Sequence, residues 1–193
     1  MSTDGTLTGN VPPVIIHTFG RFDLVIQGTP LRFTRRAPIR TLQFLGALIA
    51  HGGRGVSHGA LADALWPDAE GDDAFRCFTM TLYRLRTLLK LPRAVTLSAG
   101  RVSLDPALCH VDVWAFERAL RQARDPEALE AALSLYHGPF LGDDSQPWAI
   151  GMRLRLQQLA TRARLEIERH SQNGLASLPR AWRELSVGAS TAS

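Results

Sequence analysis

The stretch that decides the fold is DDAFRCFTMTLYRLRTLLK, residues 72–90. It contains no Gly and no Pro, and at 100° per residue its side chains separate into two arcs of a helix. The acids Asp72 and Asp73 suit a helix N-terminus, and Lys90 suits a C-terminus. The apolar arc consists of Ala74, Phe75, Phe78, Leu82, Leu85, Leu88 and Leu89, with Cys77 at its edge. We therefore predict a helix of about five turns that is buried along one side.

The opposite arc differs from an ordinary solvated helix face. It holds Arg76, Thr79, Met80, Tyr83, Arg86, Thr87 and Lys90, and it has no acid after Asp73. Surface helices usually mix charges of both signs, so that i,i+4 ion pairs form. A face of cations, hydroxyls, a Met and a Tyr favours a negatively charged, partly apolar partner such as DNA. The alternative at this point is a helix face that simply contacts water.

The net charge lies in the first half of the chain. The chain has 193 residues and is 45% hydrophobic, which predicts one or two folded domains. Up to Asp105 there are 12 Arg and Lys against 8 Asp and Glu, a balance of +4, and from Pro106 onward the count is 10 against 10. A basic surface is therefore expected in the first half. The excess is compatible with nucleic acid binding but does not require it.

Several protein classes are disfavoured by what the sequence contains. No apolar run has the length of a membrane span, and the N-terminus lacks the pattern of a secretion signal. Cys77 and Cys109 fit reduced thiols of a bacterial cytoplasmic protein. We find no metal-ligand spacing, no phosphate-binding glycine loop and no nucleophile elbow. We therefore expect no cofactor, no metal, no membrane contact and no enzymatic activity. An enzyme would depend on His58 or the Asp143–Asp144 pair, for which no pocket is evident.

The first half of the sequence is predicted to contain two strands, three helices and a hairpin. Strands are expected over 14–18 and 22–27, followed by helices over 39–50, 58–66 and 72–90. A hairpin follows within 93–105, with Gly100 at a turn position that needs positive φ. This order is typical of a winged helix-turn-helix with a small N-terminal sheet and a β wing. In that architecture the last helix enters the major groove.

The second half of the sequence is predicted to contain only helices. One begins at Asp112, another at Asp125-Pro126, and a long one runs from Pro147 to just before Asn173-Gly174. Such pairs suggest TPR-like hairpins, although no repeat of fixed period is found. The predicted class is α+β: a disordered tail (1–13), a winged-helix domain (14–106), an all-α TPR-like, truncated domain (107–174), and a short helix or disordered tail (175–193).

Six strings in order resemble one family of bacterial regulators. They are TFGRFDLVIQGTPLRF (18–33), LADALWP (61–67), TLYRLRTLLKLP (81–92), AGRVSLD (99–105), HVDVWAFERAL (110–120) and LYHGPFLGD (135–143). Together they resemble transcriptional regulators that join an OmpR/PhoB-type winged helix to a bacterial transcriptional activator domain. The resemblance covers about residues 14–174.

The resemblance implies sequence-specific binding to double-stranded DNA, often by side-by-side copies on direct repeats, and recruitment of RNA polymerase. It assigns 72–90 as the recognition helix, 93–105 as the wing, and 67–71 as the loop that often faces polymerase. The chain departs from the family in its fewer helical hairpins and in lacking the usual large ATPase or receiver module. The helical half is therefore, alternatively, a dimerisation or docking piece.

Nine residues are the candidate DNA contacts. They are Arg76, Thr79, Met80, Tyr83, Arg84, Arg86, Thr87, Lys90 and Arg101. Arg binds guanine in a bidentate manner, and Thr and Met contact a thymine methyl. Arg84, Arg86 and Lys90 are expected on phosphates, because the C-terminal end of a recognition helix usually leaves the groove. Arg101, after the wing turn, is expected in a minor groove or on a phosphate. The rival interpretation is a protein-docking module whose winged helix no longer binds DNA.

Overall fold

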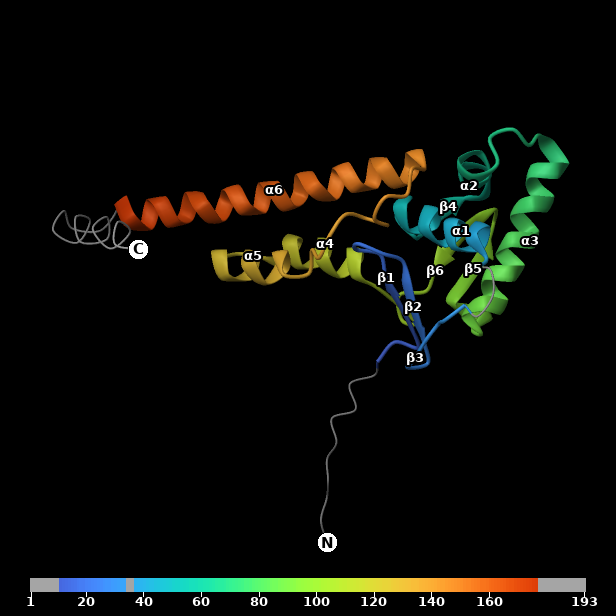
Figure 1. Ribbon diagram of the computed structural model, residues 1–193, viewed down its shortest axis with the longest axis horizontal. Coiled ribbons are helices and arrows are strands. Elements are labelled where there is room, and N and C mark those ends of the chain that lie inside the picture. Colours follow the sequence, from blue (N-terminus) through green and yellow to red (C-terminus); the bar gives the residue numbers. More distant parts are fainter. Residues whose placement is uncertain (1–10, 34–36, 177–193) are drawn as a thin grey trace, which may run out of the picture.

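The computed structural model describes residues 11–33 and 37–176 and has a mixed α+β fold (Figure 1). The strands are β1 (Val14–His17), β2 (Asp23–Ile26), β3 (Thr29–Pro30), β4 (Val56–Ser57), β5 (Val95–Ser98), β6 (Arg101–Leu104) and β7 (Cys109–Val111). The helices are α1 (Ile39–Ala50), α2 (His58–Leu65), α3 (Gly71–Leu89), the 3₁₀ turn η1 (Pro92–Ala94), α4 (Asp112–Gln122), α5 (Pro126–Leu133) and α6 (Pro147–Ala176). The predicted α+β class is confirmed.

The N-terminal sheet has the strand order β3-β2-β1-β7. Strand β1 pairs antiparallel with β2, and a two-residue turn at Gln27 and Gly28 leads into β3 with φ values of 50° and 76°. The fourth strand, β7, pairs parallel with β1 and brings Cys109 opposite Val14. The sequence pattern did not predict β7, because it has three residues and its partner β1 lies far away in the sequence. A strand beyond the hairpin therefore completes the first sheet.

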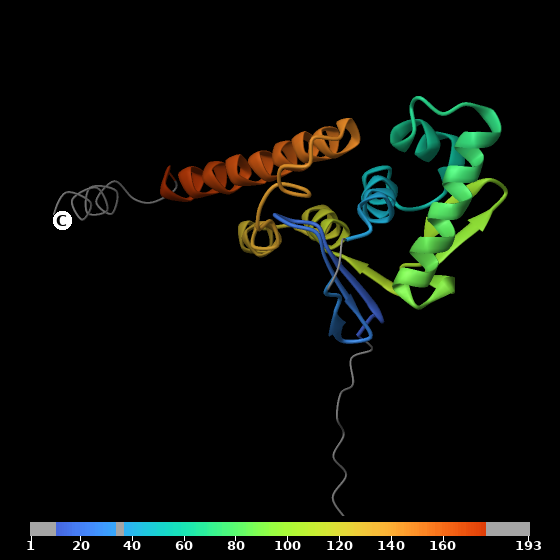
Figure 2. The ribbon, with the colours of Figure 1, turned by 45° about the vertical axis from the view of Figure 1, so that its right-hand side comes forward.

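Helix α3 packs its apolar side against α1 and α2 (Figures 1 and 2). Phe78, Leu82 and Leu85 are at most 3% exposed, and the Phe78 ring lies 5.7 Å from that of Phe44 on α1. Each such side chain stabilises the fold by roughly 1.5–3 kcal/mol. The predicted burial of Phe75 is wrong. This side chain is 55% exposed, because it lies near the helix start against the rings of His58 and Phe78 rather than under α1.

Helices α4, α5 and α6 form the second half, in which α5 packs against both neighbours (Figure 1). Asp125 begins α5 as predicted, and its side chain accepts a hydrogen bond from the Ala128 N–H at 2.8 Å. The predicted end of the long helix is wrong, since α6 continues through Asn173 and Gly174 to Ala176. A glycine inside a helix costs only about 1 kcal/mol, so it does not have to end one. Residues 1–10 and 177–193, where tails were expected, lie outside the described residues.

The two halves share one hydrophobic core. Phe19, after β1, forms a bridge with Phe140 and packs edge-to-face on Phe116 and Tyr136 at 5.7 and 5.1 Å. The carboxylate of Asp112, at the start of α4, accepts hydrogen bonds from the Thr18 N–H, the Thr18 hydroxyl and the Phe19 N–H at 2.7, 2.6 and 3.1 Å. Asp112 therefore fixes the start of the helical half to the end of β1.

Both cysteines are free thiols. Cys77 is half-buried on α3, and Cys109 is buried on β7. Burial, with a smaller contribution from the charge of Asp105, raises the pKa of the Cys109 thiol to about 12. That thiol therefore stays protonated near neutral pH. Among the described helices, none is both long and apolar enough to cross a membrane.

Candidate functional site

The outer face of α3 is the most distinctive exposed surface that the predicted residues form. Arg76, Met80, Tyr83, Thr87 and Lys90 recur at helical spacing, so they lie in one row along the helix. All five are exposed, and the two most apolar of them, Met80 and Tyr83, are 48% and 67% exposed. Figures 1 and 2 both place α3 at the rim of the molecule. We call these five residues the α3 row.

The surroundings of the α3 row are cationic. Between Ala74 and Leu104 the chain has six basic residues and no acidic one. These are Arg76, Arg84, Arg86, Lys90, Arg93 and Arg101. The Arg76 guanidinium lies 3.5 Å from the Asp73 carboxylate, but both side chains are about three-quarters exposed (74% and 76%). Such an exposed pair is weak, which leaves Arg76 available to another anion.

Thr79 and Thr87 direct their hydroxyl protons back to the helix. They donate to the Phe75 and Tyr83 carbonyls at 2.9 and 3.0 Å, the usual pattern for Thr within a helix. Both residues are exposed. Their oxygen lone pairs and methyl groups are therefore free for an outside partner, whereas their hydroxyl protons are used.

Arg86 and Arg84 differ in what they do for the fold. The Arg86 Nε–H donates to the Val95 carbonyl at 2.9 Å, and its side chain is half-buried between α3 and the start of β5. Arg84 is exposed and makes no hydrogen bond or ion pair with any described residue. Of these two predicted phosphate contacts, Arg84 is thus the cation left open to a partner. Arg86 has a role inside the fold.

The hairpin β5–β6 is held close to the body of the molecule. It pairs with β4 in a three-stranded sheet, and the Arg101 guanidinium donates to the Gly55 carbonyl at 2.8 Å. At the tip, the Gly100 carbonyl accepts from the His58 backbone N–H at 2.9 Å. Arg101 therefore lies on a different element from the α3 row, and one of its N–H groups is already used.

One exposed cation was missing from the predicted set. Arg93 lies on η1, directly after α3, and is exposed. It has no place on the helical wheel of 72–90, so the wheel could not reveal it. The absence of acids from Ala74 to Leu104 is the signal that would have found it.

The hairpin tip carries a substitution site with a predictable gain in stability. Ala99 and Gly100 have φ values of 47° and 70°, as a two-residue type I′ turn requires. Ala at positive φ is strained, whereas Asn tolerates it. We expect Ala99→Asn to raise the free energy of unfolding by about 1 kcal/mol in urea denaturation. Thr96→Asn, at an exposed strand position of the same hairpin, should give no gain; an equal gain there would contradict the strain argument.

Comparisons with known proteins show that the fold of this chain is similar to that of a solved structure. No protein-family model matches the chain, and no curated protein matches it in sequence. The fold is similar to a solved structure of Mycobacterium tuberculosis EmbR in complex with a low-affinity phosphopeptide, with a TM-score of 0.62 and 21% sequence identity. The match covers 80% of this chain and 44% of the EmbR chain. This chain therefore spans less than half of that chain and has a similar fold over most of its own length.

Proposed function

We propose that this chain is a DNA-binding transcriptional regulator in which α1, α2, α3 and the β5–β6 hairpin form a winged helix-turn-helix. The observation that carries the proposal is the exposed α3 row within a segment of six cations and no acid. Helices α1 and α2 support α3 from its apolar side. The likeness of fold to EmbR is consistent with this proposal.

In the proposed complex α3 lies in the major groove, whose width accommodates a helix. Arg76, Met80 and Tyr83 contact base edges, with Thr79 beside them. Arg84, Thr87 and Lys90 contact phosphates, since they lie on the C-terminal half of the helix. Arg86 and Arg101 serve chiefly to hold the hairpin in place and add their charge to the field at the DNA. Phosphate contacts supply much of the affinity, which therefore falls steeply with salt.

For the helical half we propose a TPR-like docking domain that follows the winged-helix domain at about residue 107. RNA polymerase and a second copy of the chain are the partners proposed for it. The boundary is not a flexible linker, because β7 belongs to the first sheet and Asp112 binds Thr18 and Phe19. We therefore propose that a partner of α4–α6 acts on the DNA-binding half through a rigid connection.

A second candidate function is protein docking through α3 without DNA. The observation in its favour is the exposed apolar area of Phe75, Met80 and Tyr83, at 55%, 48% and 67%. Affinity for random duplex DNA separates the two functions. With the two or three phosphate contacts proposed here, affinity for duplex DNA should fall by about 10- to 40-fold between 50 and 200 mM salt. A docking module should show almost no such affinity.

Sequence readout by α3 is tested with DNA selected from a random pool and then compared with random duplex by fluorescence anisotropy. Each base contact is worth about 1–3 kcal/mol of discrimination, so Arg76→Ala or Tyr83→Ala should lower the preference for the selected site by roughly 5- to 150-fold. Lys90→Ala should weaken both DNAs alike, by about 8-fold at 0.1 M salt for one phosphate contact. Small and equal effects of all three substitutions would show that α3 does not read the sequence.

A further inference from the structure

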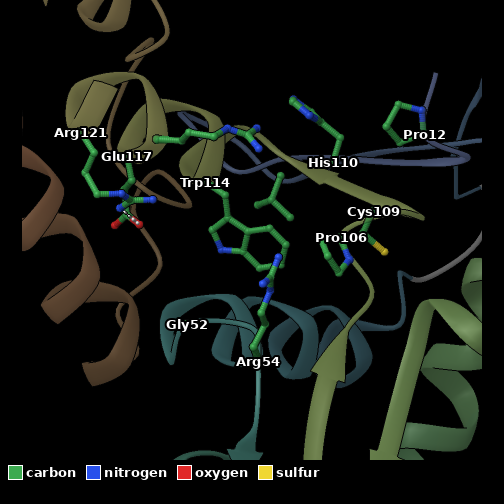
Figure 3. A pocket seen from close by; sticks show the side chains of 11 residues that line it. Pro12, Gly52, Arg54, Pro106, Cys109, His110, Trp114, Glu117 and Arg121 are labelled. Atoms are coloured by element: carbon green, nitrogen blue, oxygen red, sulfur yellow. Dashed lines mark ion pairs between the residues drawn. The ribbon is translucent and has the colours of Figure 1, made fainter. Parts of the chain in front are cut away.

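A cleft opens at the junction of the two halves, away from the outer face of α3 (Figure 3). Its walls are the glycine-rich loop between α1 and β4, the strand β7, and one face of α4. Its volume of about 530 Å³ falls within the range of pockets that bind small molecules. The lining includes Arg54, His110, Trp114, Glu117, Arg118 and Arg121.

The charges in this cleft favour an anionic ligand. Three arginines line it against one carboxylate, that of Glu117. Glu117 is already paired, with Arg155 of α6 at 2.7 Å and with Arg121 at 3.9 Å, and its side chain is 12% exposed. Arg54 and Arg118 are exposed and form no ion pair with any described residue. Two guanidinium groups on different elements therefore border the same cleft without an acidic partner.

Trp114 gives the cleft an aromatic surface at a fixed position. Its indole packs so closely on the loop that a Cβ added to Gly53 would lie 2.1 Å from Cζ2. Gly53 also has a φ of 70°, so only glycine suits this position. Figure 3 shows Arg54 from the loop and Trp114 from α4 bordering the same space. A flat ring placed on Trp114 would thus lie within reach of a cationic group from the loop.

The loop that carries Arg54 is rigid, because hydrogen bonds tie it to β6 on either side of that residue. The Gly53 carbonyl accepts from the Leu104 N–H at 2.8 Å, and the Gly55 N–H donates to the Ser103 hydroxyl at 2.8 Å. Gly55 also accepts from Arg101. A guanidinium on a fixed loop loses less conformational freedom on binding than one on a mobile loop, which favours affinity.

We propose that this cleft is a binding site for a small phosphate ester that carries a flat ring. The phosphate is held by Arg54 and Arg118, whose N–H groups form charge-assisted hydrogen bonds with its oxygens. The ring stacks on the part of the half-buried Trp114 indole that borders the cleft, because flat rings stack on aromatic side chains. The proposal concerns binding by this cleft alone, and it does not depend on whether α3 binds DNA.

The test is isothermal titration calorimetry of the full chain with adenosine monophosphate, adenosine and inorganic phosphate. We expect the mononucleotide to bind, and adenosine and phosphate each to bind at least about ten-fold more weakly, because each supplies half of the contacts. Arg54→Ala and Arg118→Ala should each weaken mononucleotide binding about ten-fold or more. Arg164→Ala, an exposed arginine on α6, is the matched control and should leave it unchanged.

Three results would overturn the proposal. The first is the absence of mononucleotide binding at millimolar concentration in a chain whose circular dichroism is that of a folded protein. The second is binding that Arg54→Ala and Arg118→Ala leave intact. The third is competition between duplex DNA and the mononucleotide, with both substitutions lowering DNA affinity, since the arginines would then belong to the DNA interface. The calorimetric titration with mononucleotide alone contains no DNA, so failure of this proposal can be distinguished from failure of the proposed function.

Discussion

Replacing Arg76 and Arg84 together by Glu is expected to lower the affinity for duplex DNA by about 100-fold or more at 0.1 M salt. Both side chains are exposed on α3, and neither is buried in the core. At this salt concentration the loss of the Arg84 phosphate contact costs about 8-fold in affinity through counterion release. The loss of the Arg76 base contact costs about 1–3 kcal/mol more on the selected duplex, or roughly 5- to 150-fold. Charge reversal adds repulsion between the carboxylates and the DNA. The measurement is an anisotropy titration of labelled duplex at several salt concentrations.

The matched control is Arg162→Glu with Arg164→Glu on α6. Both arginines are exposed, and the double substitution changes the net charge by the same amount. Only the general field of the protein is altered in the control, so we expect a small loss of affinity. The slope of log affinity against log salt should fall by about 1 in the α3 variant alone, because Arg84 is the phosphate contact of the pair. Equal losses in the two variants would mean that α3 has no special place in DNA binding.

The parts of the fold that the sequence predicted are those set by local periodicity. The spacing of Phe78, Leu82 and Leu85 identifies both the helix and its buried side, because residues four and three apart on a helix lie on one face. The hairpin was equally predictable, since Gly100 marks a turn between two alternating runs. The same periodicity predicts the exposed α3 row, because these residues lie on the side of the helix opposite the buried one.

What the sequence did not predict depends on contacts between distant residues. Strand β7 forms only because β1 offers it a free edge, and nothing in the three residues 109–111 indicates that edge. The bond from Arg86 to the Val95 carbonyl crosses from α3 to β5, so a helical wheel cannot show it. The cleft needs the loop at Gly53, the strand β7 and Trp114 together. Taken alone, each of these features is an ordinary structural element and does not indicate a binding site.

Asp112→Ala is expected to lower the free energy of unfolding by roughly 3–5 kcal/mol. The carboxylate accepts hydrogen bonds from three donors that lie 93 and 94 residues away in the sequence, on Thr18 and Phe19. Thr18 is 0% exposed and Phe19 is 7% exposed, so the donors are buried and water reaches them poorly when the acceptor is lost. A buried donor without a partner costs about 1–3 kcal/mol, and the three losses are not fully additive. The measurement is urea denaturation followed by circular dichroism.

Asp125→Ala is the control for Asp112→Ala, because Asp125 also lies at the start of a helix. Its carboxylate accepts only from the Ala128 N–H, three residues away, in an exposed position. Loss of such a cap costs about 1 kcal/mol. If Asp112 joins the two halves, its loss should also speed amide hydrogen exchange in β1, which is far from α4 in sequence, and in its neighbour β7. The Asp125 variant should leave both strands protected. The opposite result would be equal destabilisation by the two substitutions, with β1 still protected from hydrogen exchange. Asp112 would then act only as a helix cap, and packing alone would connect the two halves.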